Sequence, residues 1–148
     1  MKKTLAIVAI LSLSNLVYTY LSEQRTARRL DALEKLMREG CHVKVTATMY
    51  NAVESQCDKD PLITAGMYRI DPNRASLHRW IAVSRDLLKR WGGRFDYGDK
   101  VVVRGAGHKD GVYTIVDTMN KRFRNRIDFL ETQGTKWYKY ENVKIASL

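Results

Sequence analysis

The feature that most constrains the fold of this 148-residue chain is a series of short strand patterns after residue 41. From Val43 to Tyr50, apolar residues alternate with polar ones, which is the two-residue period of a half-buried strand. Further strands are predicted at 80–83, 100–104, 112–116, 126–130 and 142–146. A glycine-rich turn over 105–111 joins two of them, and one short helix is predicted over 85–91. The pattern predicts a mainly β fold with one or two short helices, built as a small β-barrel.

The N-terminal region is of a different kind. Met1, Lys2 and Lys3 precede a largely apolar run over 5–20, which is the form of an export signal. The run is shorter than the roughly 20 residues that span a bilayer comfortably, and no small-residue cleavage site follows it. Residues 1–21 are therefore interpreted as a signal anchor, with a cleaved signal peptide or a buried core helix as alternatives. Residues 22–40 are predicted to be a helical stalk, and 41–148 the barrel domain.

The charge of the chain indicates an anionic partner. Twenty-six Lys and Arg against sixteen Asp and Glu give a formal net charge of +10. Export disfavours nucleic acid and leaves an acidic envelope polymer or a lipid surface, so the predicted location is the cell envelope or periplasm, with the protein membrane-anchored through its N-terminal segment.

Neither a cofactor nor a metal site is predicted. The histidines lack ligand spacing, and no glycine-rich phosphate loop, nucleophile motif or dinucleotide fingerprint is present. Cys41 and Cys57 form either a disulfide or two free thiols.

Carboxylates are the remaining candidates for chemistry. Asp117 and Asp128 bracket a basic loop, and Asp128 lies between Ile127 and Phe129 in a predicted strand, so it points away from them. In a groove with apolar walls its pKa would rise, as a proton donor near neutral pH requires. The alternative is that both aspartates form surface salt bridges with the arginines of the loop.

Four segments resemble one known family in that family's order. They are "VTATMYNA", "DPLITAG", "GDKVVVRGAGHKDGVYTIVDT" and "DTMNKRFRNRID", which together cover roughly 43–131. They are similar to the three-aspartate (3D) domain and to the membrane-bound lytic transglycosylase A family. The resemblance implies a double-psi β-barrel that cleaves peptidoglycan glycan strands between N-acetylmuramic acid and N-acetylglucosamine without water. The implied reaction leaves a 1,6-anhydromuramoyl end, because the C6 hydroxyl of N-acetylmuramic acid is the nucleophile.

The resemblance also assigns roles to residues. Asp128 matches the single catalytic acid/base, and Asp117 matches a second aspartate that would orient the site and raise the pKa of Asp128. The third aspartate is matched by Asp86, or its place is taken by Ser84; Asp86 also has a structural explanation in the first turn of the short helix.

Substrate-binding roles are predicted for four further residues. Thr46 and Tyr50 lie on the polar face of the first strand, and Thr64 matches a threonine near the catalytic acid. Arg126 belongs to a basic cluster that would attract the carboxylates of muropeptides; its alternative is a solvated loop. The family's glycines are replaced here by bulkier residues between Asp117 and Asp128, so the sugar-facing loop is larger and more basic.

Two other functions stay open. One is a non-catalytic, expansin-like module that binds glycan or loosens the wall on the same barrel. The other is an envelope interaction protein in which the anchor and stalk are the working parts.

Overall fold

The computed structural model describes residues 2–38, 42–53 and 60–148, and the chain divides into two compact units, 1–40 and 41–148. The predicted stalk and the apolar run before it form one continuous helix, α1 (Lys2–Arg38). Large apolar side chains at Leu16, Tyr18 and Tyr20 are exposed on it. No helix in the described part of the chain has both the length and the apolarity needed to cross a membrane. Cys41 and Cys57 lie outside the described residues.

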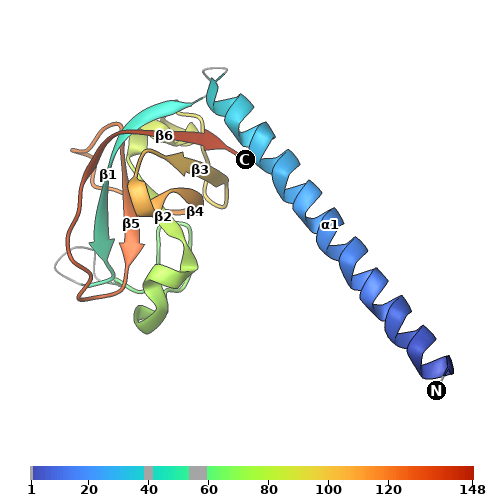
Figure 1. The fold of residues 1–148 in the computed structure, drawn as a ribbon. Helices are drawn as coiled ribbons and strands as arrows, with labels where there is room; N and C mark the ends of the chain where they lie inside the picture. Colours follow the sequence, from blue (N-terminus) through green and yellow to red (C-terminus); the bar gives the residue numbers. More distant parts are fainter. Residues whose placement is uncertain (1, 39–41, 54–59) are drawn as a thin grey trace. The chain divides into compact units, whose positions relative to one another are not determined.

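The second unit is a closed barrel of six strands (Figure 1). The strands are β1 (Val43–Asn51), β2 (Trp80–Val83), β3 (Lys100–Arg104), β4 (Gly111–Thr118), β5 (Arg126–Glu131) and β6 (Tyr140–Ser147). Around the barrel they follow the order β1-β5-β2-β4-β3-β6. The prediction of a mainly β chain with a small barrel is confirmed, and each predicted strand is present with ends that differ by at most a few residues.

The pairing of the strands has an internal twofold pattern. Strand β1 pairs parallel with β5 and antiparallel with β6, and β4 in the same way pairs parallel with β2 and antiparallel with β3. The remaining pairs, β2 with β5 and β3 with β6, are antiparallel. Each half of the chain thus contributes a strand that lies parallel to a strand of the other half. These two interlocked parallel crossovers make the closed barrel a double-psi barrel.

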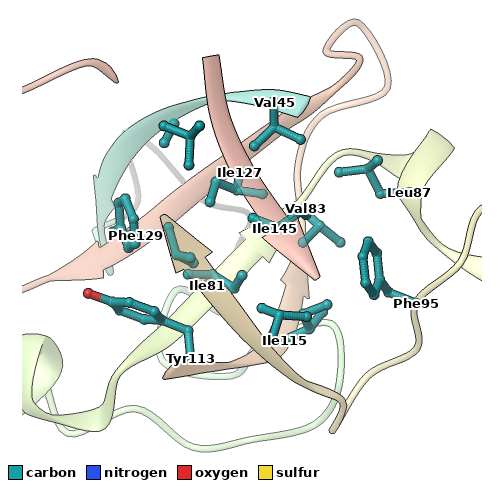
Figure 2. Close-up of a cluster of buried hydrophobic side chains, with 14 of the residues drawn as sticks. Val45, Ile81, Val83, Leu87, Phe95, Tyr113, Ile115, Ile127, Phe129 and Ile145 are labelled. Carbon is teal, nitrogen blue, oxygen red and sulfur yellow. The ribbon is translucent and has the colours of Figure 1, made fainter. Parts of the chain in front are cut away.

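The main hydrophobic core fills the inside of the barrel (Figure 2). Alternate residues of the strands point into it, which the two-residue period of a strand requires. The labelled side chains include Val45 of β1, Ile81 of β2, and Ile127 and Phe129 of β5, and all four are buried. The residues between them, among them Asp128, therefore lie on the outer face of the sheet.

A second, smaller core covers this outer face. It contains Tyr50 of β1, Ala82 of β2 and Leu130 of β5, which pack with Ile70 and Ala75. The last two belong to the connection between β1 and β2, which ends in the 3₁₀ helix η1 (Pro72–His78). The connection therefore lies over the outer face of β1, β5 and β2. The polar side chains of that face lie beside the apolar residues of this second core.

The predicted helix over 85–91 is wrong. The segment forms two 3₁₀ turns, η2 (Arg85–Leu87) and η3 (Lys89–Trp91), separated by Leu88 in an extended conformation. Leu88, which is extended between the two turns, and its neighbour Leu87 are both buried in the main core. The Ser84 side chain makes no N-cap hydrogen bond. Because the segment is not an α-helix, Asp86 has no α-helix dipole to stabilise.

Candidate functional site

The candidate site is a row of residues across four neighbouring strands, which we call the aspartate row: Thr48, Asp128, Ala82 and Asp117. Asp128 on β5 is paired on one side with Thr48 of β1 and on the other with Ala82 of β2. Ala82 is in turn paired with Asp117 of β4. Because neighbouring strands lie about 4.8 Å apart, the Cα atoms of Asp128 and Asp117 are about 10 Å apart across β2. The two aspartates that the sequence places eleven positions apart are thus brought to the same row.

A β-bulge puts Asp117 on the outer face. Ile81 pairs with Ile115, but the next residue, Ala82, pairs with Asp117, so Val116 is an extra residue in β4. A shift of one residue moves a side chain to the other face of a sheet. Without the bulge, Asp117 would point into the main core; with it, Asp117 shares the outer face with Ala82 and Asp128.

The carboxyl group of Asp128 is in a partly buried, sparsely bonded environment. Its Oδ1 accepts a hydrogen bond from the Thr48 hydroxyl. Burial raises the pKa of Asp128, and the Thr48 hydrogen bond and the positive charge of Arg126 only partly oppose this increase. In the described part of the chain Asp128 makes no ion pair. The surface salt bridge offered as the alternative is therefore not the arrangement found for Asp128, which is suited to hold a proton.

Asp117 is held in a different way. Its Oδ1 accepts hydrogen bonds from the backbone N–H groups of Ala65, at 2.9 Å, and Thr118, at 2.8 Å. Its Oδ2 accepts one from the Tyr50 hydroxyl at 3.2 Å. These donors hold the carboxyl group of Asp117 in a fixed position. The raised pKa of Asp128 has burial, and not the charge of Asp117, as its main cause.

Thr64 shapes the loop that brings the Ala65 N–H group to Asp117. Its buried hydroxyl accepts a hydrogen bond from the Tyr68 N–H at 3.0 Å, and its own N–H donates to the Tyr68 carbonyl at 2.9 Å. Gly66 then donates to the carbonyl of the bulge residue Val116 at 2.9 Å. Thr64 therefore acts on the aspartate row through the backbone of this loop.

Thr46 and Arg126 are paired in the next row of the same two strands. Because residues two apart on a strand share a face, both lie on the outer face with Thr48 and Asp128. The Arg126 guanidinium lies 5.1 Å from the centre of the Phe123 ring. The structure thus brings together Thr46, Tyr50 and Arg126 of the predicted set around Asp128.

Asp86 lies outside this row. Its Oδ2 accepts a hydrogen bond from the Asn125 N–H at 2.9 Å, and its buried Oδ1 has no hydrogen-bond partner among the described residues. No hydrogen bond links it to Asp117 or Asp128 in that part of the chain. Ser84 is buried and accepts from the Arg126 N–H at 3.0 Å. Both residues fix the end of the basic loop where it enters β5.

Thr48 is the contact that sequence reasoning missed. The alternation of β1 puts it on the same face as Thr46 and Tyr50, and this signal is present in the sequence. Its importance comes from the parallel pairing of β1 with β5, which aligns Thr48 with Asp128 eighty residues away. No local pattern predicts that register.

No protein-family model, no curated protein and no solved structure matches the chain. The family resemblance seen in the sequence therefore stays a prediction.

Proposed function

We propose that this chain is an exported peptidoglycan lytic transglycosylase with Asp128 as its single acid/base. The observation that carries the proposal is the environment of Asp128: a partly buried carboxyl group of raised pKa, with one hydroxyl donor, on the outer face of the barrel. A raised pKa keeps the acid protonated at a higher pH than an ordinary aspartate, as a general acid requires. The four sequence segments that resemble the three-aspartate domain include this residue.

The carboxyl group of Asp128 acts twice in the reaction, first as an acid and then as a base. Asp128 donates it to the glycosidic oxygen as the bond from C1 of N-acetylmuramic acid breaks. The C6 hydroxyl of the same sugar then attacks C1, and the Asp128 carboxylate accepts the hydroxyl proton. The products are a free 4-hydroxyl end and a 1,6-anhydromuramoyl end, no water is consumed, and Asp128 is regenerated in its protonated form.

The state of Asp117 supports a mechanism with one working carboxyl group. Ordinary glycosidases use two carboxyl groups, the second acting as base or nucleophile. Asp117 already accepts hydrogen bonds from Ala65, Thr118 and Tyr50, so its carboxyl oxygens are engaged within the fold. In this proposal Asp117 orients Tyr50, and Tyr50 and Thr46 contact the sugar.

The proposal includes a place for the N-terminal helix. Lys2 and Lys3 precede an apolar stretch of α1, as in an export signal. We assign 1–21 as the signal anchor and the following part of α1 as the stalk. The barrel would then act on the glycan strands of the cell envelope from a membrane attachment.

The test is digestion of purified sacculi by the full-length protein, with mass spectrometry of the soluble products. The expected products are muropeptides lighter by one water than those of a hydrolase, and Asp128→Asn abolishes them. Asp96→Asn is the matched control, because Asp96 is exposed and pairs with Lys89 at 3.0 Å away from the row. Products that contain the added water would identify a hydrolase. Sacculi that bind both proteins and release nothing would identify the expansin-like binding module.

A further inference from the structure

Two aromatic rings of the barrel unit each have two arginines over them. The Trp91 ring lies 5.3 Å from the Arg85 guanidinium and 4.7 Å from that of Arg90. Trp91 is 44% exposed, so this ring is at the surface and not in the core where a tryptophan is usually found. Stacking on the ring orders the long arginine side chains while their N–H groups stay available to solvent.

The second ring is Phe123, in the basic loop between β4 and β5. Arg122 and Arg126 lie over it at 4.8 and 5.1 Å from the ring centre. Together the two groups form what we call the arginine shelf, made of Arg85, Arg90, Trp91, Arg122, Phe123 and Arg126.

The two halves of the arginine shelf are fixed to each other by the segment around β2 and β5. The Asp86 carboxylate accepts the Asn125 N–H at 2.9 Å, next to Arg85 in one segment and Arg126 in the other. The Ser84 N–H donates to the Arg126 carbonyl at 2.9 Å, and the Ser84 hydroxyl accepts from the Arg126 N–H at 3.0 Å. These bonds hold both arginine pairs at one end of the β2–β5 pair.

The charge of Arg126 acts on the carboxyl groups of Asp128 and Glu141, but the shelf arginines form no salt bridge in the described part of the chain. Four ordered guanidinium groups that form no salt bridge among the described residues favour an anionic ligand, and guanidinium binds a carboxylate with two parallel hydrogen bonds. The ligand must approach Asp128, because Arg126 is two residues from it on the same face of β5 and its charge acts on the Asp128 carboxyl group.

We infer that the arginine shelf binds the carboxylates of the peptide stems carried by the glycan strand that crosses the aspartate row. The inference rests on the proposed function for the identity of this polymer. It adds a substrate preference: strands whose stems carry free carboxylates bind more tightly than strands without stems. Phosphates of other wall polymers share the anionic chemistry, and the test separates the two sources.

The test measures binding of the full-length protein to anionic phospholipid vesicles and to three matched polymers. The polymers are acid-stripped sacculi, which lack phosphodiester polymers, the same material freed of its peptide stems by an amidase, and unstripped sacculi. The variant is Arg90→Gln/Arg122→Gln, which removes one arginine from each ring and leaves the other in place. The control is Lys100→Gln/Lys136→Gln, which removes the same charge from exposed positions outside the shelf.

The expected result is about a tenfold loss of affinity of the shelf variant for acid-stripped sacculi, with little change on stem-free strands and little change in the control. An equal loss in the control, or on stem-free strands, would show a non-specific charge effect and overturn the inference. A loss confined to unstripped sacculi would assign the shelf to phosphates. A loss confined to anionic phospholipid vesicles would assign it to a membrane surface, and either result also overturns it.

The same samples distinguish this inference from the proposed function. If wild-type protein releases anhydro products equally from stem-bearing and stem-free strands and the shelf variant matches it, the transglycosylase stands and the shelf assignment fails. If no products form but the selective loss of binding appears, the shelf assignment stands and the proposed reaction fails.

Discussion

At the scale of single residues, the proton affinity of Asp128 is a balance between burial and two stabilising neighbours. Burial disfavours the carboxylate, whereas the Thr48 hydroxyl and the Arg126 charge favour it. Burial is the largest of the three effects. Because each neighbour acts on the ionised form, removing either one raises the pKa of Asp128 further.

Thr48→Val is expected to move the alkaline limb of the activity profile to higher pH. Valine keeps the shape of threonine but donates no hydrogen bond to Asp128, so the acid stays protonated over a wider range. The measurement is the pH dependence of kcat/KM on soluble glycan strands. Thr114→Val serves as the control, because Thr114 lies on β4, which is not next to β1 or β5, and pairs with Trp80 and Lys100. An unchanged limb, or one moved to lower pH, would show that the titrating group is not Asp128.

Asp128→Asn is expected to stabilise the fold near neutral pH. The pKa of Asp128 is raised in the folded chain, so the native state binds this proton more tightly than the unfolded state. Stability is therefore lost as pH rises from the ordinary aspartate pKa, about 3.9, through the raised value. The Tm of the variant minus the Tm of the wild type should therefore increase as the pH is raised from about 3.5 to about 7. A difference in Tm that does not change with pH would contradict the raised pKa.

Glu131 shows the opposite balance at the end of β5. It is 3% exposed and contacts the Lys109 ammonium at 2.5 Å, the Ser76 hydroxyl at 2.5 Å and the Tyr138 hydroxyl. Burial alone would raise the pKa of Glu131, but the hydrogen bonds from Lys109, Ser76 and Tyr138 outweigh it and the pKa is lowered. The ionised side chain ties η1 and the β3–β4 turn to the barrel end.

Glu131→Gln is expected to destabilise the barrel by about 2 kcal/mol, because Lys109 loses its partner at a buried position. The lowered pKa means that this contribution is present above the ordinary glutamate pKa and is lost as pH falls through the folded value. Denaturant unfolding at neutral and acidic pH measures it. Glu141→Gln is the control, since the ion pair of Glu141 with Lys139 is exposed and should matter little. Equal effects of the two variants would contradict the role given to Glu131.

At the scale of elements, the loop that carries Thr64 and Gly66 determines how Asp117 is presented. A Cβ atom added at Gly66 would lie 2.8 Å from the Val116 carbonyl oxygen, closer than such atoms approach. Gly66→Ala is therefore expected to displace the loop from the bulge of β4, at a cost of about 1–3 kcal/mol. The Ala65 N–H would then leave Asp117.

The expected outcome for Gly66→Ala is a lower Tm together with reduced kcat. Ala65→Ser is the control, because Ala65 is exposed and its backbone N–H can still donate to Asp117. If Gly66→Ala retained both stability and activity, the loop would not be the support of Asp117 that the hydrogen bonds indicate.

Much of the strand content could be predicted because it depends on local patterns. Alternation in 43–50 and the β-branched runs at 100–104 and 112–116 predicted the strands and the hairpin between β3 and β4. The two 3₁₀ turns over 85–91 were missed, because the segment bonds to a later part of the chain: the Lys89 N–H donates to the Phe95 carbonyl and the Phe95 N–H to the Leu87 carbonyl. The bulge at Val116 was missed for a related reason, since it depends on the register of β4 against β2.

The candidate site shows the same division. The position of Asp128 between two core residues was readable from β5 alone. Its alignment with Thr48 and, across Ala82, with Asp117 depends on pairings between strands far apart in sequence. Asp86 was predicted as the third aspartate of the site, with a place in the first turn of a helix as its alternative explanation; its partner, the Asn125 N–H, is brought to it only by the fold.

At the scale of the whole molecule, the barrel unit contains its own core and all of the residues of the aspartate row. Removal of residues 1–40 is therefore expected to leave its Tm and its activity on soluble glycan strands nearly unchanged. Thermal unfolding and product release of residues 41–148 measure this. A truncated protein that folds but loses activity would instead favour a function that resides in the anchor and stalk.

In the proposed reaction Asp128 protonates the departing glycosidic oxygen and then accepts the proton of the C6 hydroxyl of N-acetylmuramic acid, so no water enters the product. The most direct measurement is digestion of sacculi in water enriched in heavy oxygen, with wild-type protein and Asp128→Asn in parallel. We predict anhydro products that carry no heavy oxygen from the wild type and no products from the variant. Incorporation of heavy oxygen at the new reducing end, or products from Asp128→Asn at the wild-type rate, would contradict this account.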